Sequence, residues 1–306
     1  MIELERRTST GGLALAAPAT ALHGPVIVAT DGSPAADAAL VVGRRLAERA
    51  GERLHVLSVV DSLLVPTTGA DALPDPARLD IARTKQRLAV VREQVRKVIG
   101  EDAGACIEVE TGVPARRIAR TASELGAGII VVGIGRHRLR DRLLGTETAL
   151  QLARLADVPV LAVPASADEL PWRAVVATDL SAFSAGAARA ALGVVEHGAI
   201  VYLAHVAPRV AFAGGSWQSL APETERGIAE AFRRLRASLP EDAIATIESV
   251  TLRGEPSDAV LEFAQATAVE LVVVGTHGHG FFERLVLGGV SSKLVRAAQT
   301  AVLIVP

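Results

Sequence analysis

The stretch Leu271-Val-Val-Val-Gly275-Thr-His-Gly278, with Gly288 following it, places four apolar residues directly before a set of glycines. A short apolar run that ends in glycine is typical of a buried strand followed by a sharp turn. An earlier apolar run leads into a similar set, formed by Gly133, Gly135, Gly145 and Thr146. Because ligands of open α/β sheets bind at the carboxyl ends of strands, we expect a ligand site after each run. We therefore interpret the chain as a tandem α/β protein.

Three other segments recur, once in each half of the chain. They are Val26-Ile-Val-Ala-Thr-Asp31 with Ala174-Val-Val-Ala-Thr-Asp179, Gly112-Val-Pro114 with Gly254-Glu-Pro256, and Val160-Leu-Ala-Val-Pro164 with Val302-Leu-Ile-Val-Pro306. About 140 residues per repeat suffice for one α/β domain with its own core. We expect a first domain at residues 24–164, a linker at 165–172 and a second domain at 173–306, and we call the two domains the first and the second repeat.

Strand-sized apolar runs alternate with amphipathic stretches along each repeat. The longest amphipathic stretches predict helices at about residues 76–99 and 222–238. We expect the first helix of each repeat to be capped by the hydroxyl of Ser33 or Ser181 and to end near Gly51 or Gly198. Such alternation predicts parallel sheets with helices on both faces, which is the Rossmann-like α/β class.

Composition argues against several classes of function. A formal net charge of −2 and an aromatic content of 3% give nucleic acid neither a strongly cationic surface nor stacking platforms. No apolar run reaches the roughly 18 residues that cross a bilayer, so we expect a soluble, cytoplasmic protein with no membrane partner. The single cysteine, Cys106, lies among strand-forming residues, and we expect it to be packed inside a strand.

Residues 1–23 lie outside both repeats. Arg6-Arg7, a weakly apolar stretch and Ala19-Thr-Ala21 superficially resemble an export signal. Acidic residues beside the arginines and Pro18 within the apolar stretch argue against that alternative. We expect residues 1–23 to form a disordered tail.

The glycine loops suit phosphate binding. Backbone amides without side chains in the way can converge on phosphate oxygens, and a glycine that opens a helix lets the positive amino end face the ligand. The dinucleotide fingerprint does not fit, because its glycines follow the first strand whereas these follow the fourth. A phosphate loop of the G-x4-G-K-[ST] type does not occur. Simple tight-turn geometry without a ligand stays open as the other explanation.

Taken together, these features resemble the universal stress protein family, over nearly everything from His23 to Pro306. The resemblance implies a five-stranded parallel sheet of order 3-2-1-4-5 in each repeat and packing of the repeats as a pseudo-dimer. In one subclass it implies ATP bound through G-x2-G-x9-G-[ST], with an aspartate on the nucleoside and a valine in the adenine pocket. The implied contacts are Ala177, Asp179, Val206, Gly275, Gly278, Gly288, Gly289, Val290 and Ser291 in the second repeat, and Asp31, Val59, Gly133, Gly135, Gly145 and Thr146 in the first.

Each repeat departs from that motif. Gly289 stands where the motif has serine or threonine, and the loss of one charge-assisted hydrogen bond costs about 1.5 to 3 kcal/mol. Ser291 and Ser292 are candidates to replace that hydroxyl. The first repeat keeps Thr146 but is one residue short between Gly133 and Gly135. Its loop carries basic residues that either neutralise phosphate or form a solvated face, namely Arg136, His137, Arg138, Arg140 and Arg142.

Three histidines and the two aspartates have simpler explanations. His277 and His279 have no neighbouring cysteine or further histidine to complete a metal site, so we expect no metal ligation. His205 lies on an apolar strand, and we expect it to be a hydrogen-bonded core residue. Asp31 and Asp179 either contact a nucleoside or cap the following helix.

The sequence shows no nucleophile with a base and no carboxylates converging on magnesium. An adenylate-forming or pyrophosphatase enzyme would carry Ser-Gly-Gly-x-Asp-Ser after its first strand, which Thr30-Asp31-Gly-Ser does not match. We expect a non-catalytic protein that binds ATP, ADP or AMP, with or without magnesium, and contacts an unidentified protein partner according to occupancy. The alternatives are an interaction module with degenerate pockets and a weak ATPase.

Assembly follows from the exposed edges of the predicted sheets. We expect the fifth strands, residues 159–163 and 300–305, to pair with each other and so to remove two edges. This pairing makes the tandem chain an intramolecular pseudo-dimer. A further homodimer of tandem chains is left open.

Overall fold

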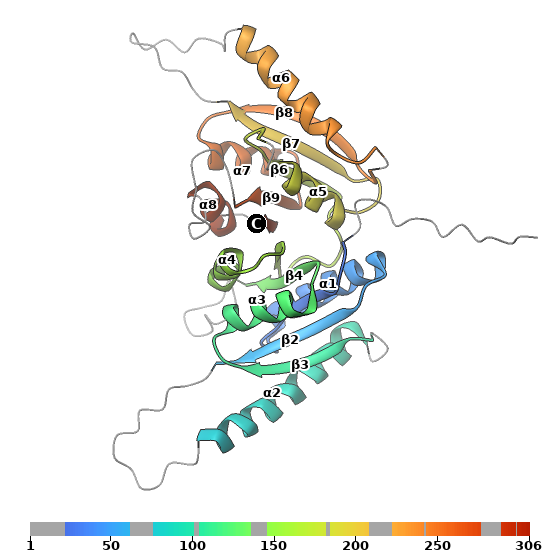
Figure 1. Ribbon diagram of the computed structural model, residues 1–306, viewed down its shortest axis with the longest axis vertical. Coiled ribbons are helices and arrows are strands. Elements are labelled where there is room, and N and C mark those ends of the chain that lie inside the picture. The colour runs from blue at the N-terminus through green and yellow to red at the C-terminus, as the bar shows by residue number, and fades with distance from the viewer. Residues whose placement is uncertain are drawn as a thin grey trace, which may run out of the picture.

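The structure is a computed structural model that describes residues 22–61, 76–100, 104–135, 146–181, 184–207, 222–241, 243–276, 289–297 and 299–306. Within these residues the chain forms one long sheet with helices on both faces (Figure 1). Residues 1–21, and with them nearly all of the predicted tail, lie outside the described residues. No helix in the described ranges combines the length and the apolarity needed to cross a membrane.

The first repeat alternates strands and helices along its whole length. Its elements are β1 (Val26–Ala29), the 3-10 helix η1 (Pro34–Ala36), α1 (Asp37–Ala50), β2 (Leu54–Val60), α2 (Pro76–Ile99), β3 (Cys106–Thr111), α3 (Pro114–Leu125), β4 (Ile129–Ile134), α4 (Thr146–Leu155) and β5 (Val160–Pro164).

The second repeat follows the same order. Its elements are β6 (Arg173–Ala177), α5 (Ser184–Val194), β7 (Ile200–Ala207), α6 (Pro222–Ala237), β8 (Thr246–Arg253), α7 (Pro256–Ala266), β9 (Leu271–Gly275), α8 (Gly289–Ala297) and β10 (Ala301–Val305).

All ten strands join in the order β3-β2-β1-β4-β5-β10-β9-β6-β7-β8. Strands pair in parallel within each repeat, whereas β5 and β10 pair antiparallel, with Leu303 opposite Leu161. The α/β class and the pairing of the fifth strands are therefore confirmed. Because β5 and β10 cover each other's ladder groups, β3 and β8 are the edges of the sheet that the described residues form.

Alternate residues of each strand supply two cores, one on each face of the sheet. Val26 and Val28 belong to the core beneath α1, α2, α5 and α6, whereas Ile27 and Ala29 belong to the core beneath α3, α4, α7 and α8. Strands that are buried on both faces need continuous apolar runs, which is the pattern of the central strands here. Each core continues through both repeats, so the repeats share their hydrophobic interior.

Polar contacts also join the repeats. At the end of α1, Arg49 donates hydrogen bonds to the carbonyls of Gly193 and Val195 at the end of α5. The last carbonyls of a helix lack partners within it and carry partial negative charge, so a guanidinium there is stabilising. Burial lowers the pKa of Arg49 from its ordinary value, which marks how far this side chain is withdrawn from water. A second polar contact between the repeats is an exposed ion pair at 2.8 Å between Glu147 of α4 and Arg296 of α8.

The ends of the first helices differ in part from the sequence expectation. Gly51 ends α1 in a left-handed conformation with φ of 67°, as predicted. Ser33 occupies the N-cap position of η1, but its side chain makes no capping hydrogen bond. The hydroxyl of Ser181 has no hydrogen-bond partner among the described residues. The prediction of hydroxyl caps was therefore wrong, and the neighbouring aspartates accept the amides of Ser33 and Ser181 themselves. In the second repeat, α5 ends at Val194, before the predicted Gly198.

The prediction that Cys106 is packed inside a strand was also wrong. Cys106 is the first residue of β3, and its side chain is exposed. The position is exposed because β3 is an edge strand with no partner on its outer side. Sequence composition around Cys106 identified a strand but not its place in the sheet.

Candidate functional site

The carboxyl ends of the two central strands lie side by side in each repeat. β1 pairs with β4 through Ala29 and Val132, and β6 pairs with β9 through Val176 and Val273. The predicted aspartate and first glycine follow these pairs closely, and they are Asp31 with Gly133 and Asp179 with Gly275. The fold thus brings the aspartate loop and the glycine-bearing strand to one edge of the sheet in both repeats. Ligands of open α/β sheets bind at this edge.

In the first repeat the loop after β1 is held by its own side chains. The Gly32 amide donates to Thr30 Oγ1 at 2.9 Å, and the Ser33 amide donates to Asp31 Oδ1 at 2.9 Å. Gly32 has φ of 79°, which glycine adopts without steric cost. The carboxylate of Asp31 therefore has a structural role in shaping the loop.

Gln94 on α2 is hydrogen-bonded to this loop. Its Oε1 accepts a hydrogen bond from Thr30 Oγ1 at 2.8 Å, and its Nε2 donates to Ser33 O at 2.8 Å and to Asp37 Oδ1 at 2.7 Å. Thr30 and Gln94 are buried, with exposed fractions of 1% and 8%. Buried polar groups that are fully paired make a structure rigid. The loop of the first repeat is accordingly bound to α2 as well as to the sheet.

A hollow with a volume of about 440 Å³ adjoins Asp31 on the side of α2. Arg87, which lines it, donates a hydrogen bond to the backbone carbonyl of Asp31. Arg83 adds a second guanidinium, while Asp61 adds a carboxylate. The hollow therefore presents both charges beside the predicted nucleoside contact. Its lining residues are Asp31, Val60, Asp61, Arg83, Gln86, Arg87 and Val90.

Backbone atoms of η1 lie directly against the end of β4. A Cβ added at Gly133 would meet Ala35 O at 2.4 Å and Ala36 Cα at 2.9 Å. Contacts this short with backbone atoms leave no room for any side chain at this position. Packing alone therefore requires a glycine at position 133, whether or not a ligand binds nearby.

The equivalent loop of the second repeat has Leu180 at the position that Gly32 occupies in the first. The Leu180 amide donates to Thr178 Oγ1 at 2.9 Å, and Asp179 Oδ1 accepts from the Ser181 amide at 3.0 Å and from Ser184 Oγ at 2.8 Å. Ser184 is the first residue of α5, so Asp179 links the loop to the helix. Leu180 has φ of 62°, in the left-handed region that disfavours residues with a side chain.

His205 on β7 supports this loop from the sheet. Its Nδ1 lies 3.0 Å from Thr178 O, and since a carbonyl only accepts, Nδ1 carries the proton. The ring stands edge-to-face against Phe232 of α6, with 6.5 Å between the ring centroids. His205 is half-buried. The predicted hydrogen bond of His205 is confirmed, but the side chain lies at the margin of the core and not within it.

Glu255 connects α7 with α8, the helix that follows the second glycine loop, through an exposed ion pair. It precedes α7, where its Oε2 accepts from Ser257 Oγ at 2.7 Å, from the Asp258 amide at 3.0 Å and from Lys293 Nζ of α8 at 3.3 Å. Lys293 also pairs with Asp258 at 2.8 Å. The hydroxyl of Ser257, the amide of Asp258 and the cation of Lys293 together lower the pKa of Glu255 to about 2. Val113, at the same place before α3, provides no side-chain cap.

The remaining predicted contacts are distributed over both sheet and helices. Val59 is buried at the end of β2, while Val206, Ala177 and Gly135 are half-buried. Gly289, Val290 and Ser291 form the first turn of α8, and Thr146 is the first residue of α4. The rest of the predicted set lies outside the described residues, and comprises Gly145, Gly278, Gly288, the basic residues at 136–142, His277 and His279.

Sequence reasoning did not find Gln94, Arg87, Glu255 or Lys293. Glutamine within a long amphipathic helix, and lysine one turn into a short one, are ordinary surface residues by pattern. Glu255 had a signal, because an acidic residue directly before a proline that opens a helix suits an N-cap. Within the described residues, no group of three or more histidines, cysteines or carboxylates is placed to hold a metal ion.

Comparison with known proteins gives one family. The model of the universal stress protein family matches residues 23–164 and again 173–306. A universal stress protein of Mycobacterium tuberculosis is 26% identical over 305 residues, which cover 91% of this chain and 94% of that protein. A universal stress protein of Methanocaldococcus jannaschii is 30% identical over 143 residues, which cover 45% of this chain and 84% of that protein.

A solved structure extends the likeness to three dimensions. The crystal structure of a universal stress protein from Archaeoglobus fulgidus superposes with a TM-score of 0.63 at 17% identity, covering 92% of this chain and 96% of that one. At this identity the likeness concerns the fold. With the family model matched twice and relatives aligned along nearly the whole chain, the protein belongs to the universal stress protein family as a tandem member.

Proposed function

We propose that this tandem universal stress protein binds an adenine nucleotide, ATP, ADP or AMP, at the carboxyl edge of its sheet. One observation carries the proposal: in the second repeat the Asp179 loop and the glycine-bearing end of β9 lie on neighbouring parallel strands. The carboxylate of Asp179 can accept hydrogen bonds from a ribose or a base, and the glycines leave backbone amides accessible to phosphate. Gly289 opens α8, whose amino end favours negative charge.

We place the principal site in the second repeat, because that repeat keeps the full spacing of the glycines. The proposed contacts there are Ala177, Asp179, Val206, Gly275, Gly278, Gly288, Gly289, Val290 and Ser291. The first repeat offers a weaker site through Asp31, Val59, Gly133, Gly135, Gly145 and Thr146. Two facts weaken it: its loop is one residue shorter, and backbone of η1 lies against Gly133.

The proposed mode of action is occupancy rather than turnover. A bound nucleotide, with or without magnesium, changes the surface that a protein partner contacts at this edge of the sheet. We propose no catalytic residue. The proposal also takes the domains at residues 24–164 and 173–306, a cytoplasmic location and, beyond the intramolecular pseudo-dimer, a homodimer of tandem chains.

A second candidate function is an interaction module that binds no nucleotide. The hydrogen bonds of both aspartates favour it, because Asp31 and Asp179 each accept from an amide two residues further on. An aspartate that shapes its own loop explains the residue without any ligand. The two candidates differ in whether nucleotide accompanies the purified protein.

Mass spectrometry of small molecules released from the denatured, freshly purified protein tests the proposal. We expect ATP, ADP or AMP from the parent and none from Gly278→Asp, because a carboxylate in the loop repels phosphate. Gly227→Asp on α6 is the matched control, since nothing lies within 4 Å of a Cβ added there. Absence of nucleotide from the parent, with no thermal shift on adding ATP, would leave the interaction module as the function.

Conservative variants separate the two repeats. Asp179→Asn and Asp31→Asn keep the oxygen that accepts the loop amide but remove the charge. We expect Asp179→Asn to weaken ATP binding about tenfold, as for a lost charge-assisted hydrogen bond, and Asp31→Asn to change it less than twofold. Titration calorimetry measures both. The reverse order would move the principal site to the first repeat.

A further inference from the structure

The two edge strands of the sheet carry side chains of different chemistry at the equivalent positions that face their covering helices. Leu57 and Ala204 hold equivalent places, since each accepts the amide of the threonine after the first strand, and they pair with Glu108 and Val250. By this register Ile107 and Val109 of β3 correspond to Ser249 and Thr251 of β8. In β3 the apolar side chains therefore face α2 and the acidic ones face α3. In β8, Ser249 and Thr251 face α6, while Val250 and Leu252 pack toward α7.

This difference between apolar residues in β3 and hydroxyl-bearing residues in β8 changes how the covering helix packs. α2 packs along α1, β2 and β3, whereas α6 contacts its neighbouring elements more sparsely. α6 is anchored by Phe232 and Leu235, which are buried in the core on that face. On this face of β8, Ile247 packs against the same core, but Ser249 and Thr251 present hydroxyl groups to the rest of the helix in place of apolar side chains. A groove with a volume of about 500 Å³ remains between α6 and β8.

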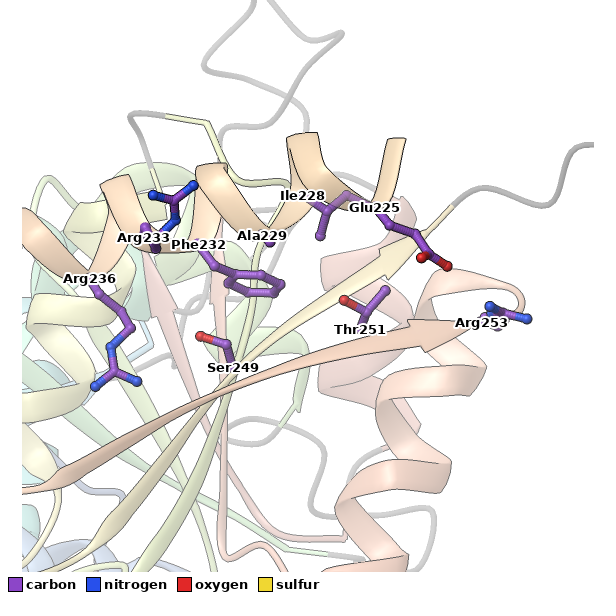
Figure 2. A pocket seen from close by; sticks show the side chains of 9 residues that line it. All are labelled: Glu225, Ile228, Ala229, Phe232, Arg233, Arg236, Ser249, Thr251 and Arg253. Atoms are coloured by element: carbon purple, nitrogen blue, oxygen red, sulfur yellow. The ribbon is translucent and has the colours of Figure 1, made fainter. Parts of the chain in front are cut away.

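Figure 2 shows the chemistry of this groove. The Phe232 ring lies between helix and strand, Ser249 and Thr251 rise from β8 on the side of α6, and Arg236 and Arg253 stand at opposite ends. Arg233 is the third guanidinium of the lining, and Glu225 is its one carboxylate. The balance of charge in the groove is therefore positive. An aromatic wall, two hydroxyls and guanidinium groups at both ends complement a flat molecule that carries an anionic group.

We propose that the groove between α6 and β8 binds a small aromatic anion of the arylcarboxylate class. The volume falls within the range of roughly 300–1,000 Å³ that is typical of small-molecule sites. A guanidinium pairs with a carboxylate through two parallel hydrogen bonds, and the ring of the ligand packs against Ile228, Ala229 and the accessible edge of Phe232. This site is separate from the proposed nucleotide edge and does not depend on it.

A peptide that adds a strand to β8 is the competing occupant. Arg236 argues against it, because its Nη1 already donates to Ile247 O of the edge strand at 2.6 Å. That carbonyl is one of the acceptors an added strand would use. The side-chain contact makes β8 a poorer template for backbone pairing, while leaving the lining of the groove open.

Titration calorimetry with 2-naphthoate tests the proposal on the full chain. We expect binding by the parent protein and at least tenfold weaker binding by Arg253→Gln, which removes one cation without altering the anchoring residues of α6. The neutral analogue 2-naphthalenemethanol should bind at least tenfold more weakly than the acid. Arg234→Gln is the control, because Arg234 pairs with Glu230 along the exposed side of α6 and does not line the groove. It should change the affinity less than twofold.

A double variant tests whether the hydroxyl-bearing residues of β8 keep the groove open. Ser249→Ile with Thr251→Val gives β8 the residues that β3 has, so α6 should close on the strand, abolish naphthoate binding and raise the melting temperature. Circular dichroism checks that the variant is folded. Failure of 2-naphthoate to bind at millimolar concentration, equal affinity across the variants, or displacement by ATP would each overturn the proposal. Binding of an extended acidic peptide in place of naphthoate would overturn it in favour of strand addition.

Discussion

The two repeats share one backbone plan but stabilise the candidate site with different contacts. In the first repeat, the loop after β1 is hydrogen-bonded to α2 through Gln94. In the second, His205 of β7 bonds the corresponding loop, while Glu255 and Lys293 connect α7 with the helix after the glycine loop. The difference shows that equivalent parts of the two repeats are held by contacts from different elements. In the first repeat α2 contacts the aspartate loop, and in the second a strand does.

The largest expected effect concerns the close contact between η1 and Gly133 in the first repeat. Gly133→Val drives a side chain into Ala35 O and Ala36 Cα, so we expect a loss of about 3 kcal/mol in the free energy of unfolding. Urea unfolding measures it. Gly186→Ala on α5 is the control, because its Cβ meets nothing within 4 Å and a helical alanine should add about 0.5–1 kcal/mol. A Gly133→Val protein as stable as its parent would contradict this packing of η1.

The next effect breaks the network of Gln94. Gln94→Leu leaves the Ser33 carbonyl and the Thr30 hydroxyl without their partner in a buried setting, so we expect a loss of about 2 kcal/mol. Gln86→Leu on the same helix is exposed and should cost less than about 0.5 kcal/mol. Chemical unfolding of both variants gives the comparison. Equal losses would mean that the network contributes nothing specific.

Substitution at the left-handed position should destabilise the first repeat more than the second. Gly32→Ala meets Val90 Cγ1 at 2.6 Å and forces a side chain into positive φ, so we expect a loss of about 1–2 kcal/mol. Leu180→Gly removes that strain from the second repeat, offset by the lost packing of a half-buried leucine. We expect a net change within about 1 kcal/mol. Thermal melts would contradict this interpretation if both substitutions destabilised equally.

The smallest effect is the pH dependence that Glu255 contributes to the stability of the second repeat. The pKa of Glu255 is lowered to about 2 in the folded protein from an ordinary 4.5. Its stabilising contribution is therefore complete above pH 4.5 and is lost as the pH falls from 4.5 toward 2. In melting curves across this range, the difference between the parent and Glu255→Gln should shrink as the pH falls. A difference that stayed constant with pH would contradict the role of its charge.

The sequence alone determined the architecture. Apolar runs ending at Asp31 and Asp179, and the recurrence of Gly-x-Pro before the third helices, were sufficient to predict two α/β repeats and the edge that carries the candidate site. Such features are local: a few consecutive residues specify a strand, its end and the turn that follows. The pairing of the fifth strands followed from their apolar character and was confirmed.

Tertiary structure decided which residues support that edge and where a second groove opens. Gln94 and Thr30 are 64 positions apart in the sequence, and Lys293 and Glu255 are 38 positions apart. These pairs come into contact only because of the way the helices pack on the sheet. The sequence shows that polar and apolar residues alternate along β8. It does not show which set faces α6, because a register shift of one residue exchanges the two faces of a strand. Local sequence fixes which elements form, whereas the contacts between distant elements fix which side chains share a site, and only the folded chain brings those together.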